Sequence, residues 1–180
     1  MRYRRARVPG GCYFFTLVTH QRCQLFGSEA AVNLLRTAFR SVMRKHPFSL
    51  DAIVVLPDHL HCIWTLPPGD ADFARRWRLV KTAFTRRCSP AWYGGVPPAT
   101  PVGKQGRQVW QRRYWEHVIR DEDDFRAHVD YIHYNPVRHG YVNRPADWAW
   151  SSFGRFVRRG VLASDWGATE ICFAEGVGRE

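Results

Sequence analysis

The fold is decided by the stretch Ser49-Leu-Asp-Ala-Ile-Val-Val-Leu-Pro-Asp-His-Leu-His-Cys-Ile-Trp-Thr-Leu66. It contains two runs that are rich in β-branched and aromatic residues, 49–56 and 59–66, and such runs are typical of strands. Pro57 and Asp58, which separate the runs, favour a short turn. The stretch therefore predicts an antiparallel β-hairpin.

The segments on either side of this hairpin alternate between strand and helix patterns. Further strands are predicted over 12–19 and 109–119, and helices over about 28–45, about 70–87 and from about Glu122 until Pro136 kinks or ends the last one. This order is typical of an α+β fold with a mainly antiparallel sheet, and we expect a ferredoxin-like or RRM-like core with helices covering one face. We expect one domain over 1–160 and a C-terminal tail over 161–180.

The charge of the chain points to a polyanionic partner. Lys and Arg total 27 against 16 Asp and Glu, which gives a formal net charge of +11. Apolar residues make up 45% of the chain, which argues against intrinsic disorder. No apolar run approaches the ~20 residues that span a bilayer, and the basic N-terminus is unlike a secretory signal. We therefore expect a cytoplasmic protein that binds nucleic acid and no membrane.

A pair of histidines in the second strand of the hairpin is a candidate metal site. His59 and His61 are two residues apart, so their side chains leave the same face of the strand and can converge on one ion. The pair alone is weak evidence, because eight histidines in a chain of this length often produce such a spacing by chance.

The helix that follows Glu122 carries a second set of candidate residues. Tyr131 and Asn135 are four residues apart on one stripe, so both can reach one site. A tyrosine beside a metal can act as a covalent nucleophile, and the amide oxygen of Asn135 can complete the metal shell. His128 is a candidate proton acceptor. The alternative is a half-buried tyrosine with a helix-terminal Asn and a surface histidine, and the proline after Asn135 disfavours helical geometry there.

Several blocks of the chain resemble a known family. Residues 54–64 (VVLPDHLHCIW) resemble the HUH motif of the single-tyrosine transposases, and residues 130–141 (DYIHYNPVRHGY) resemble their nucleophile helix. The likeness is strongest to the REP-associated tyrosine transposases and extends to Arg4-Arg5, residues 110–117 (WQRRYWEH) and residues 148–152 (WAWSS). Several blocks in the right order are far more specific than one His-x-His pair.

This resemblance implies a fold, a chemistry and a substrate. It implies an HUH fold in which Tyr131 is the nucleophile and His59 and His61 hold a divalent metal, Mg²⁺ or Mn²⁺. Asn135 stands where insertion-sequence relatives often have Gln and is the candidate third ligand. The implied activity is single-strand cleavage and strand transfer on imperfect palindromic REP-like hairpins through a 5′-phosphotyrosine link. The protein is expected to act as a monomer or a homodimer.

Basic and aromatic residues outside this site are candidates for holding single-stranded DNA. Stacking surfaces interleaved with cations hold unpaired bases, and arginines grip phosphates. The candidates are Arg2, Arg4 and Arg5 in an N-terminal arm, Arg75, Arg78 and Arg86 on one helix, and Trp110, Arg112, Arg113 and Trp115 in one strand. The alternatives are core packing for the tryptophans and a solvated helix face for the arginines.

Two other classes of function compete with the transposase hypothesis. A non-catalytic nucleic-acid-binding module or repressor of RRM-like fold explains the charge but leaves His59, His61 and Tyr131 without a joint purpose. A metal-dependent hydrolase that uses water as nucleophile predicts that Tyr131→Phe stays active and that no covalent adduct forms. The acidic tail over 161–180 is either a disordered end or a segment that folds over the DNA groove.

Overall fold

The computed structural model describes residues 7–89, 92, 109–169, 171, 173 and 177–178. The predicted arm residues Arg2, Arg4 and Arg5 lie outside this range. The strands are β1 (Cys12–Val18), β2 (Ser49–Val55), β3 (His59–Thr65) and β4 (Trp115–Val118). The helices are α1 (Glu29–Lys45), α2 (Phe73–Arg87), α3 (Glu122–Arg138) and α4 (Phe153–Arg158), with short 3₁₀ turns η1 (His20–Arg22) and η3 (Pro145–Asp147).

The four strands form one sheet in the order β2-β3-β1-β4, and every neighbouring pair is antiparallel. The predicted hairpin is present, with Val54 opposite His61 and Val55 opposite Leu60. The element order β1-α1-β2-β3-α2-β4 in this sheet order is the ferredoxin-like arrangement. The predicted α+β class with a mainly antiparallel sheet and flanking helices is therefore confirmed.

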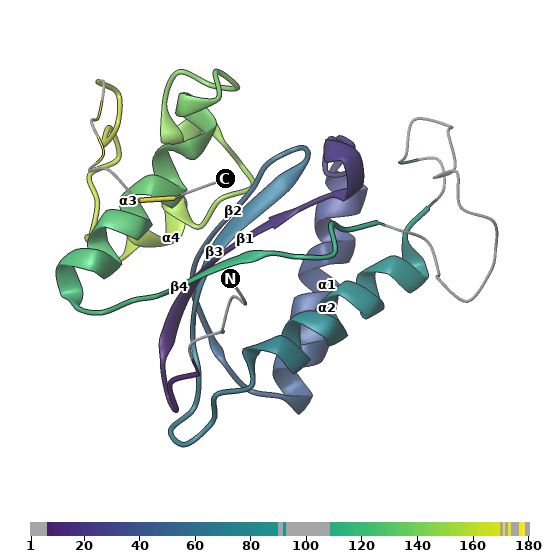
Figure 1. Ribbon diagram of the computed structural model, residues 1–180. Helices are drawn as coiled ribbons and strands as arrows, with labels where there is room; N and C mark the ends of the chain where they lie inside the picture. The colour runs from purple at the N-terminus through teal and green to yellow at the C-terminus, as the bar shows by residue number, and fades with distance from the viewer. Residues whose placement is uncertain are drawn as a thin grey trace.

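Helices cover both faces of the sheet, not one as the sequence predicted (Figure 1). Alternate β1 side chains point to opposite faces, so Tyr13 and Phe15 pack under α1 and α2, whereas Phe14 packs under α3. The larger core lies on the α1 and α2 side, where Trp64 stacks on Trp77 with centroids 4.1 Å apart. The α3 face carries a smaller apolar cluster and most of the buried polar side chains.

Two predicted elements differ in length from what the sequence indicated. The strand expected over 109–119 is regular only at Trp115–Val118, because its earlier part contacts β1 through a single bridge between Thr19 and Trp110. Helix α3 continues through Pro136 to Arg138, so the proline does not end it. The ring of Pro136 removes one main-chain N–H donor. Because Pro136 lies close to the C-terminal end of α3, few further helical hydrogen bonds depend on it.

Helix α3 is fixed at both ends by local contacts. Asp121 caps its start by accepting a hydrogen bond from the main-chain N–H of Asp124 at 2.8 Å. Gly140 follows its end with a φ of +71°, a left-handed conformation that suits glycine. Among the described residues, no helix is long and apolar enough to cross a bilayer.

Candidate active site

The histidine pair of β3 lies buried on the face of the sheet that α3 covers. The two imidazole centroids are 4.9 Å apart. The Nδ1 atom of His59 lies 2.5 Å from Oδ1 of Asp58, and Nδ1 of His61 lies 2.9 Å from Oγ1 of Thr16. Because each Nδ1 is engaged by a neighbouring side chain, Nε2 is the atom that each ring can offer to a metal.

Asp58 is held in its charged form. Burial alone would raise the pKa of its carboxyl group, but hydrogen bonds from His59 and from Arg22 lower it below the usual range. An ionised carboxylate accepts hydrogen bonds only, so Nδ1 of His59 carries the proton and Nε2 carries the lone pair. Asp58 therefore fixes the tautomer that a metal ligand requires.

Helix α3 places a stripe of side chains opposite this pair. The ring of Tyr131 lies 5.2 Å from that of His61, and the ring of His139, just after the helix, lies 5.3 Å from that of His59. Asn135 is one helical turn after Tyr131 and one turn before His139, on the same stripe. Because its two neighbours on the stripe each contact one histidine of the pair, Asn135 lies on the side of α3 that faces β3.

The side chain of Asn135 fits a metal ligand. It is 0% exposed, and neither its Oδ1 nor its Nδ2 atom has a hydrogen-bond partner among the described residues. A buried amide without partners costs about 1–3 kcal/mol, which is unusual in a native fold. Two imidazoles and one amide oxygen are donors that suit a divalent first-row metal. The residues present therefore fit a metal at this position.

Residues of the C-terminal tail cover Tyr131, which is 1% exposed. The ring of Phe173 lies 5.8 Å from the Tyr131 ring at an angle of 82°. Gly178 packs so closely on Tyr131 that a Cβ atom there would clash with the phenol ring. The guanidinium of Arg138 lies 5.3 Å from the centre of the same ring. In this conformation a substrate reaches the phenol only if the tail moves.

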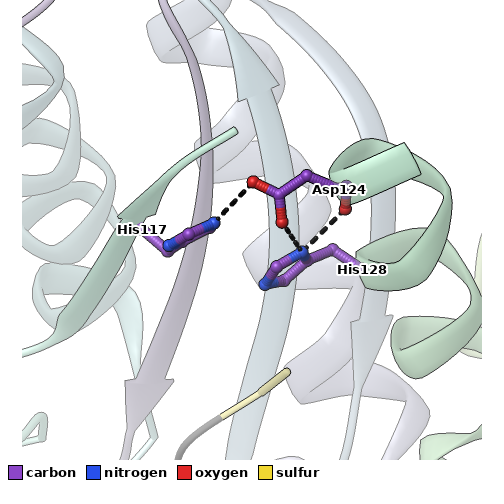
Figure 2. Close-up of side chains that lie close together, drawn as sticks. All are labelled: His117, Asp124 and His128. Atoms are coloured by element: carbon purple, nitrogen blue, oxygen red, sulfur yellow. Dashed lines mark hydrogen bonds and ion pairs between the residues drawn. The ribbon is translucent and has the colours of Figure 1, made fainter. Parts of the chain in front are cut away.

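A second polar cluster lies beside the first, between β4 and the start of α3 (Figure 2). The Asp124 carboxylate lies 2.8 Å from Nε2 of His117 and 3.1 Å from Nδ1 of His128. These three side chains bring potential metal-ligand atoms within 4.8 Å of one another. The two imidazole rings stack on each other at an angle of 17°, and Arg120 also donates to the carboxylate at 3.0 Å.

The hydrogen bonds of this cluster favour a structural role, in which Asp124 connects α3 to β4, over a metal centre. Burial alone would raise the pKa of Asp124, but hydrogen bonds from Arg120 and His117 lower it to about 2. Because nearly parallel rings cannot both direct in-plane lone pairs at one ion, the observed arrangement suits a carboxylate that bridges two imidazoles. The sequence places Asp124 and His128 on one helical stripe, but nothing in it signals the contact of Asp124 with His117 on β4.

The predicted DNA-binding residues differ in their exposure. Arg75, Arg78, Arg86, Arg112 and Arg113 are exposed, and Trp115 is half-buried beside His117. Trp110 is only 7% exposed, with its ring against Phe26 and Phe84 in the larger core. Stacking of Trp110 on DNA remains a prediction, and one that requires the ring to leave the core.

Known proteins resemble the chain along its whole length. No family model matches it. A REP-associated tyrosine transposase of Escherichia coli (strain K12) is 43% identical over 175 residues, which cover 97% of this chain and 95% of that protein. The solved structure of a REP-associated tyrosine transposase bound to a REP hairpin has a TM-score of 0.82 at 42% identity, covering 100% of this chain and 98% of that one.

These comparisons place the chain among the tyrosine transposases, enzymes that cleave DNA and transfer its strands. Within that class the chain belongs to the family of REP-associated tyrosine transposases. The resemblance inferred from residues 54–64 and 130–141 is therefore confirmed. Membership implies a divalent metal.

Proposed function

We propose that the chain cleaves and rejoins single-stranded DNA at REP-like hairpins, with Tyr131 as the nucleophile. The observation that carries the proposal is the arrangement of α3 against β3. It brings the Tyr131 ring within 5.2 Å of the His61 ring, and it buries the Asn135 amide one helical turn away on the same stripe. The relative bound to a REP hairpin supports the choice of substrate.

His59, His61 and Asn135 would hold the metal, for which we propose Mg²⁺ or Mn²⁺. A divalent metal bound there supplies Lewis-acid polarisation of the scissile phosphate. Asp58 and Thr16 orient the two imidazoles, and the sheet and α3 exclude water from them. The protein's own contribution is thus to position the phosphate and the nucleophile in a dry site.

Tyr131 carries out the covalent step. Its phenolic oxygen attacks the phosphorus in line, a new O–P bond forms, and the bond from phosphorus to the 3′ oxygen breaks. The phenol loses its proton and the leaving 3′ oxygen gains one, so the products are a 5′-phosphotyrosine and a free 3′-OH. Because the phosphodiester energy is conserved in the link, attack by another 3′-OH reverses the step and joins strands without ATP.

A gel assay with a matched control tests this proposal. Wild type, Tyr131→Phe and Tyr134→Phe are incubated with labelled hairpin DNA and Mn²⁺ and separated under denaturing conditions. Tyr134 is the control because it is buried in the same helix, one turn further on. We expect adducts with wild type and Tyr134→Phe, and none with Tyr131→Phe.

The competing functions give different outcomes in the same assay. Cleavage by Tyr131→Phe without any adduct would establish a hydrolase that uses water. Metal-independent hairpin binding by all three proteins, with neither cleavage nor adduct, would establish a binding module or repressor.

A further inference from the structure

A groove lies on the side of the sheet opposite the active site, between α1 and the segment that follows η3. It has a volume of about 280 Å³. Its lining is largely apolar and includes Ile53 of β2, Met43 of α1 and Trp150. Arg36 and Arg40 stand on its rim. The groove thus combines a flat aromatic surface with two exposed cations.

Three of the described arginines line the groove, and among them only Arg155 donates to main-chain carbonyl groups, those of Leu50 and Asp51. Arg36 donates only to the neutral amide of Asn33, at 3.0 Å, and Arg40 makes no ion pair with any described residue. None of the described residues that line the groove is acidic. Together with Arg44, these side chains form the basic stripe of α1. An anion is therefore the complementary ligand.

A row of aromatic side chains connects this groove with the active site. From His59 the row passes to His139 (5.3 Å), then to Tyr141 (5.9 Å), to Trp148 (5.5 Å) and to Trp150 (5.3 Å). The two middle contacts are stacked, with interplanar angles of 26° and 27°. Tyr141 is 41% exposed, unusually high for so large an aromatic residue.

The row passes around the edge of the sheet at β2. Trp148 packs with the apolar cluster on the α3 side, whereas Trp150 packs with the core on the α1 side. Both are anchored to Val55, since the main-chain N–H of Val55 donates to the Trp150 carbonyl (2.9 Å) and Nε1 of Trp148 donates to the Val55 carbonyl (3.0 Å). Val55 pairs with Leu60, the residue between the two histidines. The groove and the metal ligands are therefore held in fixed register.

We propose that this groove binds an unpaired nucleotide of the same DNA strand whose scissile phosphate lies at His59 and His61. The base stacks on Trp150 against the apolar lining, and the adjoining phosphate pairs with Arg36 and Arg40. Aromatic faces beside cations are the general means of holding unpaired bases, and nucleic acid supplies both a flat π surface and an anion. The inference rests on the proposed function and adds to it a site that fixes the single-stranded flank of the hairpin.

Affinity measurements on two substrates test the groove. One probe is a hairpin with its single-stranded flank, and the other is the same hairpin without it. We expect Arg40→Ala to weaken binding of the flanked hairpin about threefold to tenfold and to leave binding of the bare hairpin unchanged. Arg44→Ala is the matched control, because it removes the same charge from the same stripe without lining the groove. Equal affinities for the two variants on both probes would overturn the inference.

Photo-crosslinking locates the base. The flank carries 5-iodouracil at each position in turn, and the crosslinked residue is identified by mass spectrometry in the full-length wild-type protein. A crosslink to Trp150 from one flank position is expected, and crosslinks only to residues outside the groove would overturn the inference. The covalent adduct is measured in parallel. If the adduct forms but no crosslink reaches the groove, the groove inference alone fails; if no adduct forms, the proposed function fails.

Discussion

Asn135 occupies a position that no purely structural account of the fold explains. Its amide is completely buried, and neither polar atom has a partner among the described residues. The carbonyl oxygen of an amide is a metal donor, whereas a leucine of similar size would pack there without a desolvation penalty. We therefore expect the Asn135 amide to lower the stability of the metal-free protein, and the proposed ligand role gives a reason for its presence there.

Replacing Asn135 with leucine separates stability from metal binding. We expect Asn135→Leu to raise the free energy of unfolding of the metal-free protein by about 1–3 kcal/mol, because the unsatisfied amide is removed. Addition of Mn²⁺ should stabilise the wild type and not the variant. Denaturant unfolding with and without Mn²⁺ measures both effects. A variant less stable than the metal-free wild type, or still stabilised by Mn²⁺, would contradict the assignment.

At the scale of the elements, the candidate site depends on the position of α3 against the sheet, because α3 carries Tyr131 and Asn135 and β3 carries the two histidines. Asp124 ties the first turn of α3 to β4 through His117, and Tyr131 follows two turns later. The carboxylate also accepts hydrogen bonds from the main chain and side chain of Arg120. This tie therefore sets the register in which Tyr131 and Asn135 face β3.

The depressed pKa of Asp124 predicts a loss of stability in acid. The pKa is about 2 in the folded state against 3.8 ordinarily, so the ionised form contributes stability above pH 4 that is lost as the pH falls from about 4 to about 2. We expect wild type to exceed Asp124→Asn in free energy of unfolding by about 2 kcal/mol at neutral pH. Other carboxylates cancel in this difference, which should shrink towards pH 2. If the difference in unfolding free energy between wild type and Asp124→Asn stays constant with pH, the stabilising role of the ionised Asp124 carboxylate is contradicted.

Two described residues of the C-terminal tail cover the proposed nucleophile, Tyr131. Phe173 and Gly178 contact the Tyr131 ring, whereas Gly167 packs on Pro145 and Tyr134 away from it. We therefore expect a chain that ends at Thr169 to form the covalent adduct severalfold faster than the full chain. Time courses at saturating hairpin concentration measure the rate. An unchanged or slower rate would show that the tail does not limit access.

The elements differ in how well the sequence predicts them. The hairpin of β2 and β3 follows from strand propensity and from the Pro57-Asp58 turn, so its antiparallel pairing was predictable, whereas the register shift between Leu50 and Ala52 was not. Helix α3 was predicted to end or kink at Pro136, yet it runs on to Arg138, because tertiary packing outweighs the loss of one terminal hydrogen bond. The short helix α4 was not predicted, since its six residues carry no clear period.

For the whole molecule, the sequence predicted which residues share a face of one element better than it predicted which distant segments meet. Residue spacing within single elements placed His59 with His61 and Tyr131 with Asn135. Contacts between distant segments were not predictable in this way, and they include the bond from Thr16 to His61 and the packing of Trp110 in the core. The aromatic row from His139 to Trp150 also combines segments whose proximity only the fold creates.

The central claim is that Tyr131 forms the covalent link with DNA, and mass spectrometry of the trapped adduct tests it most directly. Trypsin cleaves after Arg126 and Arg138, so one peptide, residues 127–138, carries both Tyr131 and Tyr134. Fragmentation of this peptide distinguishes the two tyrosines. A nucleotide attached to Tyr131 is the result expected. A nucleotide on Tyr134 or on any other residue, or DNA cleaved with no modified peptide, would contradict the account.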